Sequence, residues 1–181
     1  MTGLPEASVG IDPSYSGYAV VVIDDDGHHE EHLLDLSPAK YGTGAARLFL
    51  VHACLSDLYA SVRDRYDVHR ICLEGYAPGS RFGREVLGEL GGITRLALAQ
   101  TWPPDLLTVV SPSAAKKFAT GSGTAPKDTV LLQVYKKWGA EFASNDLADA
   151  YVLARVARGM TLGTSWKYEE QVVKALRSGK D

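Results

Sequence analysis

The chain has 181 residues, of which 45% are hydrophobic and 23% charged, and its formal net charge is −3. This length suits one compact domain with a sizeable core, and the composition is ordinary for a globular protein. A slightly acidic chain is not expected merely to coat nucleic acid, and no apolar run has the length of a membrane span.

Neither the N-terminus nor the cysteines indicate export. Residues 1–8 lack the basic and apolar regions of a signal peptide, so we expect a cytoplasmic protein without membrane contact. Cys54 and Cys72 lie in segments that are typical of a helix interior and a strand. In a reducing compartment we expect both to remain free and to fill core positions.

Three antiparallel strands are expected at the start of the chain. Short apolar segments that are rich in β-branched residues and separated by turn residues are typical of strands. The expected strands span 7–12, 17–24 and 30–36. Asp25-Asp26-Gly27 is a hairpin signal between the second and third strands, and the charges of the third place it at a sheet edge.

Asp12 is the unusual residue of the first strand. It follows the apolar Val9 and Ile11 and precedes a turn over 13–17, so the strand delivers a carboxylate to its own C-terminal end. Asp before Pro often caps a turn, which is one interpretation. The other is a buried carboxylate with a partner, for which a divalent metal is well suited. The first strand and its turn alone support the two interpretations equally.

Helices and strands alternate through the rest of the chain. Apolar residues at helical spacing, or short strand-like runs, are separated by Gly and Pro. In order, we expect a helix over 44–66, a strand over 69–74, a loop over 77–80, a helix over 82–100, a strand over 106–110, a helix from 112 to the glycines of 121–125, and helices over 126–138, 146–158 and 166–177. Ser111 is the expected N-cap of the helix that starts at Pro112.

The helix over 82–100 carries three glycines. Each costs a free helix up to about 1 kcal/mol relative to alanine, so we expect this helix to pack closely against the sheet or another chain. The glycines are Gly88, Gly91 and Gly92. The residues expected to face inward are Val86, Leu87, Leu90, Ile93, Leu96 and Ala97.

This order of elements predicts an α/β fold: a mixed five-stranded sheet, with three antiparallel strands followed by parallel strands, flanked by helices. The strand over 69–74 follows a helix, so a right-handed crossover places it parallel to the first strand and beside it. No repeat or low-complexity linker divides the chain. We expect one domain over 1–181, with a core at about 7–158 and a C-terminal tail at 159–181.

Four carboxylates from three distant segments are expected to meet. Asp12 and Glu74 end neighbouring strands, at the edge where open α/β sheets bind ligands. Asp146 and Asp149 share one face of a helix that is otherwise apolar. Taken singly, Glu74 is typical of a surface residue and Asp146 of a first-turn acid. Together the four predict an oxygen-ligand site for two Mg²⁺ or Mn²⁺ ions, which is the apparatus of phosphodiester hydrolysis.

Lysines gather in the segment between Ser113 and Trp138, where they stand against the single acid Asp128. They are Lys116, Lys117, Lys127, Lys136 and Lys137. This pattern indicates a local basic face on an acidic protein, and the alternative is a solvated helix face.

The motifs around these residues resemble those of the RuvC Holliday-junction resolvases, in the RNase H-like superfamily. The resemblance runs from Val9 to about Ala157, and the order and approximate spacing of the motifs agree. The matching segments are Gly10-Ile11-Asp12-Pro13-Ser14 with Gly17, Leu73-Glu74-Gly75-Tyr76, Leu87-Gly88-Glu89-Leu90-Gly91-Gly92, the lysine-and-glycine segment 111–127, and Asp146-Leu147-Ala148-Asp149-Ala150. Each motif is weak alone, and the set is specific. The divergence outside the motifs is more typical of a phage-encoded branch.

The resemblance implies a homodimeric, metal-dependent endonuclease that cuts two strands of a four-way DNA junction and leaves 5′-phosphate and 3′-hydroxyl ends. By position, the four acids match the family's metal-binding residues. Lys116 and Lys127 match its two basic residues near the scissile phosphate, where they would contact the DNA backbone, with Lys117 beside them.

One position departs from the family pattern. The family often has an aromatic residue three places after the second acid, and here that place holds Ala77. Tyr76 or Phe82 would substitute, because aromatic faces stack on bases without sequence preference. Arg81 and Arg84 make the same loop basic and add DNA contacts. We therefore expect a broader specificity for branched DNA that includes flaps or forks.

Three alternatives stay open. One is an RNase H-fold nuclease that processes structured RNA, although such chains are typically shorter and lack the full lysine-and-glycine segment. Another is a non-catalytic protein that binds DNA structures, although all four acids are present. The last is a sugar-kinase-like ATP binder, a fold that needs two such domains where this chain has room for one.

Overall fold

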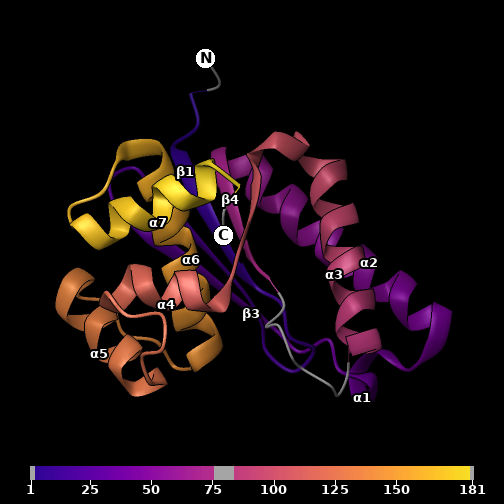
Figure 1. Ribbon diagram of the computed structural model, residues 1–181. Helices are drawn as coiled ribbons and strands as arrows, with labels where there is room; N and C mark the ends of the chain where they lie inside the picture. Colours follow the sequence, from indigo (N-terminus) through magenta and orange to yellow (C-terminus); the bar gives the residue numbers. More distant parts are fainter. Residues whose placement is uncertain (1–2, 76–83, 180–181) are drawn as a thin grey trace.

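The computed structural model describes residues 3–75 and 84–179, and a sheet in the order β3-β2-β1-β4-β5 runs through its centre (Figure 1). The strands are β1 (Glu6–Asp12), β2 (Tyr18–Asp24), β3 (His29–Leu34), β4 (Asp67–Glu74) and β5 (Leu107–Val110). The helices are α1 (Pro38–Tyr41), α2 (Gly44–Arg65), α3 (Arg84–Thr101), α4 (Pro112–Thr120), α5 (Lys127–Trp138), α6 (Asn145–Leu162) and α7 (Lys167–Arg177), with a 3₁₀ turn at Pro104–Leu106.

The strand pairing confirms the predicted mixed sheet. β1 pairs antiparallel with β2 and parallel with β4, β2 pairs antiparallel with β3, and β4 pairs parallel with β5. The hairpin predicted at Asp25-Asp26-Gly27 forms, with the Gly27 amide donating to Asp24 O at 3.1 Å. Because β1 and β4 are adjacent and parallel, their C-terminal ends meet at one edge of the sheet.

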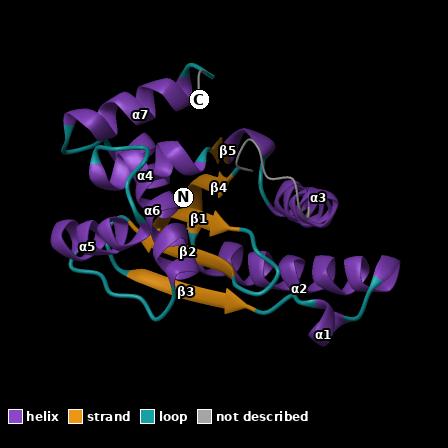
Figure 2. Ribbon diagram, turned by 60° about the horizontal axis from the view of Figure 1, so that its bottom comes forward, coloured by secondary structure: helices purple, strands orange, loops and turns teal. Residues whose placement is uncertain are grey.

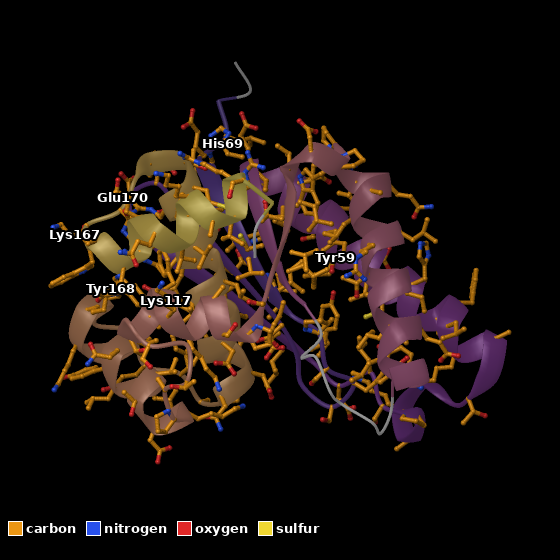
Figure 3. The ribbon with its side chains drawn as sticks, in the orientation of Figure 1. Tyr59, His69, Lys117, Lys167, Tyr168 and Glu170 are labelled. Atoms are coloured by element: carbon orange, nitrogen blue, oxygen red, sulfur yellow. The ribbon has the colours of Figure 1, made fainter. Side chains whose placement is uncertain are left out.

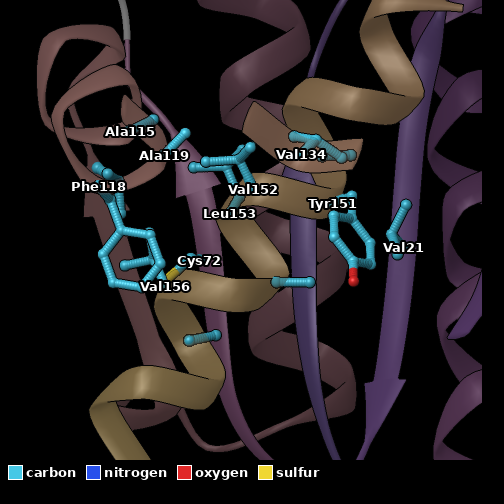
Figure 4. Close-up of a cluster of buried hydrophobic side chains, with 14 of the residues drawn as sticks. Val21, Cys72, Ala115, Phe118, Ala119, Val134, Tyr151, Val152, Leu153 and Val156 are labelled. Atoms are coloured by element: carbon cyan, nitrogen blue, oxygen red, sulfur yellow. The ribbon is translucent and has the colours of Figure 1, made fainter. Parts of the chain in front are cut away.

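Helices cover both faces of the sheet, with α2 and α3 on one face and α4 to α7 on the other (Figure 2). The two-residue period of the strands divides their side chains between two cores. On β2, the core with α2 and α3 receives Tyr18, Val20 and Val22. The core around α6 receives Ala19, Val21 and Ile23, with Cys72 of β4, and Figure 4 shows Val21 and Cys72 among the side chains of α4 and α6.

The two-residue period also directs the side chains at the C-terminal end of β1 toward α6. Val9 and Ile11 are buried in the core with α2 and α3, so Gly10 and Asp12 face α6. A Cβ atom on Gly10 would lie 2.0 Å from Ala150 O and 2.2 Å from Ala154 N. Only glycine therefore allows α6 to lie directly on β1, and this contact sets the position of the start of α6 relative to the end of β1.

Gly10→Ala is expected to lower the free energy of unfolding by about 3 kcal/mol or more, because backbone atoms of α6 cannot yield to a methyl group. Gly88→Ala is the matched control, because a Cβ atom there meets nothing within 4 Å. The control should hold or raise stability by up to about 1 kcal/mol through helix propensity. Urea unfolding followed by circular dichroism measures both, and equal stability of the two variants would contradict the close approach.

Two expectations for the helix over 82–100 are corrected by the structure. Leu96 was expected to face inward, but it is 53% exposed on α3. Gly88 and Gly92 make no close approach to the rest of the chain, so packing against the chain's own sheet does not explain these two, whereas Gly91 is buried. Apolar periodicity marks a buried face but cannot distinguish a core from a surface that another molecule covers.

Among the described residues, one helix, α2, is long and apolar enough to cross a membrane by length and composition alone, although the sequence indicated no apolar run of that length. In the fold it packs on the sheet through Val51, Leu55, Tyr59 and Val62, all of which are fully buried. One face of α2 therefore belongs to the core that it forms with α3 and the sheet.

The C-terminal segment is part of the fold rather than an appendage to it. The expected core boundary near 158 falls inside α6, and α7 packs on α4 and α6 through Val172, Val173 and Leu176. A buried ion pair joins α5 to α7, since Lys137 Nζ lies 2.5 Å from Glu169 Oε1 and both side chains are 5% exposed. Lys137 therefore does not belong to the solvent-facing basic surface that the sequence indicated.

Candidate active site

The two strand-end acids lie side by side, as the sequence predicted. The parallel register pairs Gly10 with Cys72 and Ile11 with Leu73, and one residue further Asp12 and Glu74 end the two strands. Both face α6 by the strand period. A hydrogen bond joins the two carboxyl groups. Asp12 is 8% exposed, so it is a buried carboxylate.

The start of α6 brings the other two acids to the same edge. Ser144 caps the helix, with its hydroxyl accepting from Leu147 N at 3.2 Å. A Cβ atom on Gly17 would lie 2.2 Å from Asp146 Oδ2, so the turn after Asp12 lies directly against the Asp146 carboxylate. Asp149 follows one turn later and is half-buried.

Burial and mutual repulsion govern the electrostatics of this cluster. Burial, followed by the charge of Glu74 and their shared hydrogen bond, raises the pKa of Asp12 to about 9, and Asp149 and Asp146 add to the shift. Burial also raises the pKa values of Glu74 and Asp149. Carboxylates that repel one another in a partly dry site need either protons or cations.

Two of the predicted lysines lie at the acids. Lys127, the first residue of α5, places Nζ 3.5 Å from Asp149 Oδ2, and its side chain stays 59% exposed. The charges of Lys127 and Lys116 oppose the upward pKa shifts of Glu74 and Asp149. Lys116 is carried by α4, whose predicted N-cap Ser111 accepts from Ala114 N at 3.2 Å.

Lys117 lies elsewhere. It lines a hollow of about 300 Å³ between α4 and α7, together with Gln171 and Val172. Figure 3 shows it on α4 near Tyr168 of α7. Of the residues named as DNA contacts, Tyr76, Arg81 and Phe82 lie outside the described residues, as does the loop over 77–80, and Arg84 begins α3.

The donor chemistry at this edge fits a hard divalent cation. All four candidate ligands are carboxylates, which Mg²⁺ and Mn²⁺ prefer. A bound cation would offset both the burial and the repulsion that raise the pKa of Asp12. Across residues 3–75 and 84–179, no group of three or more His, Cys, Asp or Glu side chains lies close enough together to hold one ion. In the described arrangement, Asp12 and Glu74 share a hydrogen bond, and burial raises the pKa values of both carboxyl groups.

Arg47 supports the turn after Asp12 and was missed by the sequence reading. It is 6% exposed on α2, and its guanidinium lies 3.8 Å from the ring centroid of Tyr15, within that turn. Arg47 Nη2 also donates to Leu36 O at 2.9 Å, while Leu36 N donates to Tyr15 O at 2.7 Å. An arginine in the first turns of an amphipathic helix gives no sequence signal that distinguishes it from a solvated residue.

Comparisons with known proteins find likeness in structure only. No protein-family model matches the chain, and no curated protein matches it. The solved structure of Thermus thermophilus RuvC is 19% identical, with a TM-score of 0.61, over 96% of this chain and 97% of that one. The same protein in complex with a Holliday junction substrate is 20% identical, with a TM-score of 0.61, over 97% of both chains.

A third solved structure extends the likeness to a eukaryote. The yeast mitochondrial Holliday junction resolvase Ydc2 is 15% identical, with a TM-score of 0.52, over 98% of this chain and 86% of that one. The likeness covers 96% to 98% of this chain in the three comparisons, and the mixed five-stranded sheet flanked by helices agrees with the expectation from the sequence. This chain therefore has the RNase H-like fold of the RuvC resolvases.

Proposed function

We propose that this chain is a metal-dependent endonuclease that resolves four-way DNA junctions by phosphodiester hydrolysis, leaving 5′-phosphate and 3′-hydroxyl ends. The observation that carries the proposal is the meeting of Asp12, Glu74, Asp146 and Asp149 with Lys127 at one edge of the sheet. The fold shared with proteins named as Holliday junction resolvases agrees with it. Flaps and replication forks are further substrates, as the departures in the loop after Glu74 indicate.

In this proposal the four acids hold two Mg²⁺ ions, for which Mn²⁺ substitutes. Such ions supply an activated water and stabilise the charge that develops on the leaving oxygen. To bind the ions, Asp12 and Glu74 would have to lose the proton that they share. The positive charge of the ions would favour this loss. The exposed Lys127 and Lys116 hold a phosphate of the DNA strand over the acids. The chain itself supplies no nucleophile.

A cleavage experiment tests the proposal and its rivals together. The purified chain is incubated with a mobile four-way junction, a flap, a duplex and a structured RNA, each with Mg²⁺ and with a chelator. We expect paired cuts in the junction, weaker cutting of the flap, none of the duplex, and complete loss with the chelator. Preferential cutting of RNA, or junction binding without any cutting, would replace the proposal with one of the two nucleic-acid alternatives.

Lys127→Ala is expected to lower kcat/KM for junction cleavage by about tenfold to a hundredfold, because it removes a charge-assisted phosphate contact. Lys116→Ala should have a similar effect. The folding stability of Lys127→Ala should change little, because its ion pair is exposed to solvent. Lys136→Ala, on the exposed surface of the same helix, is the matched control. Equal rates and equal binding for Lys127→Ala and this control would count against a phosphate contact by Lys127.

Arg47→Met is expected to lower kcat about tenfold while leaving the Kd for junction DNA unchanged. The variant keeps the aliphatic stem but loses the stacking on Tyr15 and the bond to Leu36 O, so the turn beside Asp12 loosens. Arg63→Met, at an exposed site on the same helix, is the control. If the Kd for junction DNA rose in parallel with the fall in kcat, Arg47 would act on DNA binding and not through the turn beside Asp12.

The proposed enzyme is a homodimer through the α2–α3 layer. Large apolar side chains are exposed there, with Phe49 at 72%, Leu50 at 47% and Leu96 at 53%. A second copy would cover the face of α3 on which Leu96 is exposed. We also propose that the protein works in the cytoplasm, where a branched-DNA substrate would be found.

A further inference from the structure

A polar cavity lies on the opposite side of α6 from the acids. It has a volume of about 80 Å³ and lies between the C-terminal half of α6 and the start of α7. It adjoins an outer hollow of about 440 Å³, and the two share Gly159 and the segment 163–166 as lining. Figure 3 shows Lys167, Tyr168 and Glu170 at this end of α7, on the flank away from α2 and α3.

Two arginines of α6 line the inner cavity without a carboxylate partner. Neither Arg155 nor Arg158 forms an ion pair with any acid in the described ranges. Arg158 Nη2 donates to Asp25 O at 2.6 Å, and its Nε is buried without a hydrogen-bond partner in the part of the chain that the structure describes. Arg155 lies 4.9 Å from the Trp138 ring centroid and hydrogen-bonds Tyr151. Arginine stays charged in proteins, so two half-buried cations face this space.

The carboxylate that lines the inner cavity is already engaged. Glu169 Oε1 lies 2.5 Å from Lys137 Nζ, and Glu169 Oε2 accepts from Ser165 N at 3.2 Å. Glu169 is thus paired with Lys137 while its charge also acts on Arg155. Because Arg155, Arg158 and Lys137 face this single carboxylate, positive charge remains in excess around the inner cavity. The outer hollow adds Lys167 and Arg177 against Glu170. The region is basic within a chain whose net charge is −3.

We propose that this cavity binds a phosphate group. Two guanidiniums and the hydroxyl residues Thr164 and Ser165 provide the donors that a tetrahedral oxyanion accepts. A cavity of about 150 Å³ holds a benzene ring, so the inner cavity, at about 80 Å³, has room for one phosphate group but not for a base. Trp166 is 51% exposed at the mouth and stacks on Tyr168, which gives an aromatic face to whatever carries the phosphate.

The site is separate from the scissile phosphate of the proposed reaction. Arg155 and Arg158 lie roughly 9–18 Å along α6 from Asp149 and Asp146, and about half a helical turn round the axis. The bound phosphate is therefore either free in solution or part of a DNA segment that passes the far side of α6. The proposal goes beyond the proposed nuclease activity and does not depend on it.

The test uses the full chain and two probes, inorganic phosphate and a short single-stranded oligonucleotide, at constant ionic strength. Trp138 and Trp166 line the cavity, so tryptophan fluorescence should change saturably on binding. Arg158→Gln should weaken the response at least tenfold, and Arg63→Gln, which removes an exposed charge, should leave it unchanged. A response to inorganic phosphate alone identifies a free anion, and displacement of phosphate by the oligonucleotide identifies DNA. No response in the wild type, or equal responses in both variants, would overturn the proposal.

A measurement on the wild-type chain covers the case in which Arg158→Gln fails to fold. Phosphate should protect Arg155 and Arg158 from phenylglyoxal, which modifies accessible guanidiniums, as read from peptide masses. Arg63 should be modified equally with and without phosphate. Equal modification of Arg155 and Arg158 in the two conditions would also overturn the proposal.

Discussion

Asp149→Asn is expected to reduce cleavage of a four-way junction by about three orders of magnitude or more while leaving junction binding intact. The substitution keeps the shape of the side chain but removes a negative charge that the proposed metal site requires. Asp12→Asn and Glu74→Gln should behave in the same way. Single-turnover cleavage with Mg²⁺ measures the rate, and a gel shift in the presence of a chelator measures binding.

Asp128→Asn provides the matched control for these variants. Asp128 is exposed in the first turn of α5, close in sequence to Lys127 but outside the carboxylate cluster. It should retain the wild-type rate, which would show that the loss reflects the cluster and not a lower negative charge near the DNA. Full activity in any of the three cluster variants would remove that residue from the site.

The sequence alone was sufficient for most of the fold because its strands and helices have strong local patterns. The β-branched run of β2 and the hairpin at Asp25-Asp26-Gly27 both formed where predicted. The short helix α1 was not predicted, since four residues with no buried side chain leave no periodicity to detect. Leu96 was placed in the core, because a helix with apolar residues on two faces has the same pattern whichever face the sheet covers.

The meeting of the acids was predictable from strand order, but its geometric cause was not. Gly10 and Gly88 are the same residue type, yet Gly10 is in contact with the backbone of α6, whereas Gly88 has open space beside it. Lys137 and Lys127 both belong to a lysine-rich segment, yet one is buried on Glu169 and the other is exposed beside Asp149. Such differences arise from contacts between segments far apart in the chain, which local patterns do not encode.

The free energy of unfolding of the metal-free protein is expected to fall as the pH rises from 6 to 8. The pKa of Asp12 is about 9 in the folded state, above its ordinary value of 3.8, because burial and Glu74 disfavour the charged form. A group with a raised folded pKa contributes stability below its unfolded pKa, and this stability is lost as the pH rises toward the folded pKa. Between the two values, one bound proton corresponds to a loss of about 1.4 kcal/mol per pH unit.

Asp12→Asn isolates this effect, because asparagine does not titrate and still fits beside Glu74. Urea unfolding at pH 6, 7 and 8 should show a loss of about 2–3 kcal/mol in the wild type beyond that in the variant. The interval avoids Glu30, whose pKa is lowered by Arg65 and which stays ionised throughout. Parallel pH profiles for the two proteins would show that Asp12 does not hold a proton in the folded state.

Mg²⁺ should reverse the pH trend in the wild type alone. Metal binding requires the ionised carboxylates and so competes with the proton on Asp12, which makes the stabilisation by Mg²⁺ grow as the pH rises. In Asp12→Asn a ligand is lost, so the added ion should stabilise less at every pH. If Mg²⁺ stabilised both proteins equally, the ion would bind outside the cluster, and the raised pKa of Asp12 would be a property of a buried carboxyl pair with no metal function.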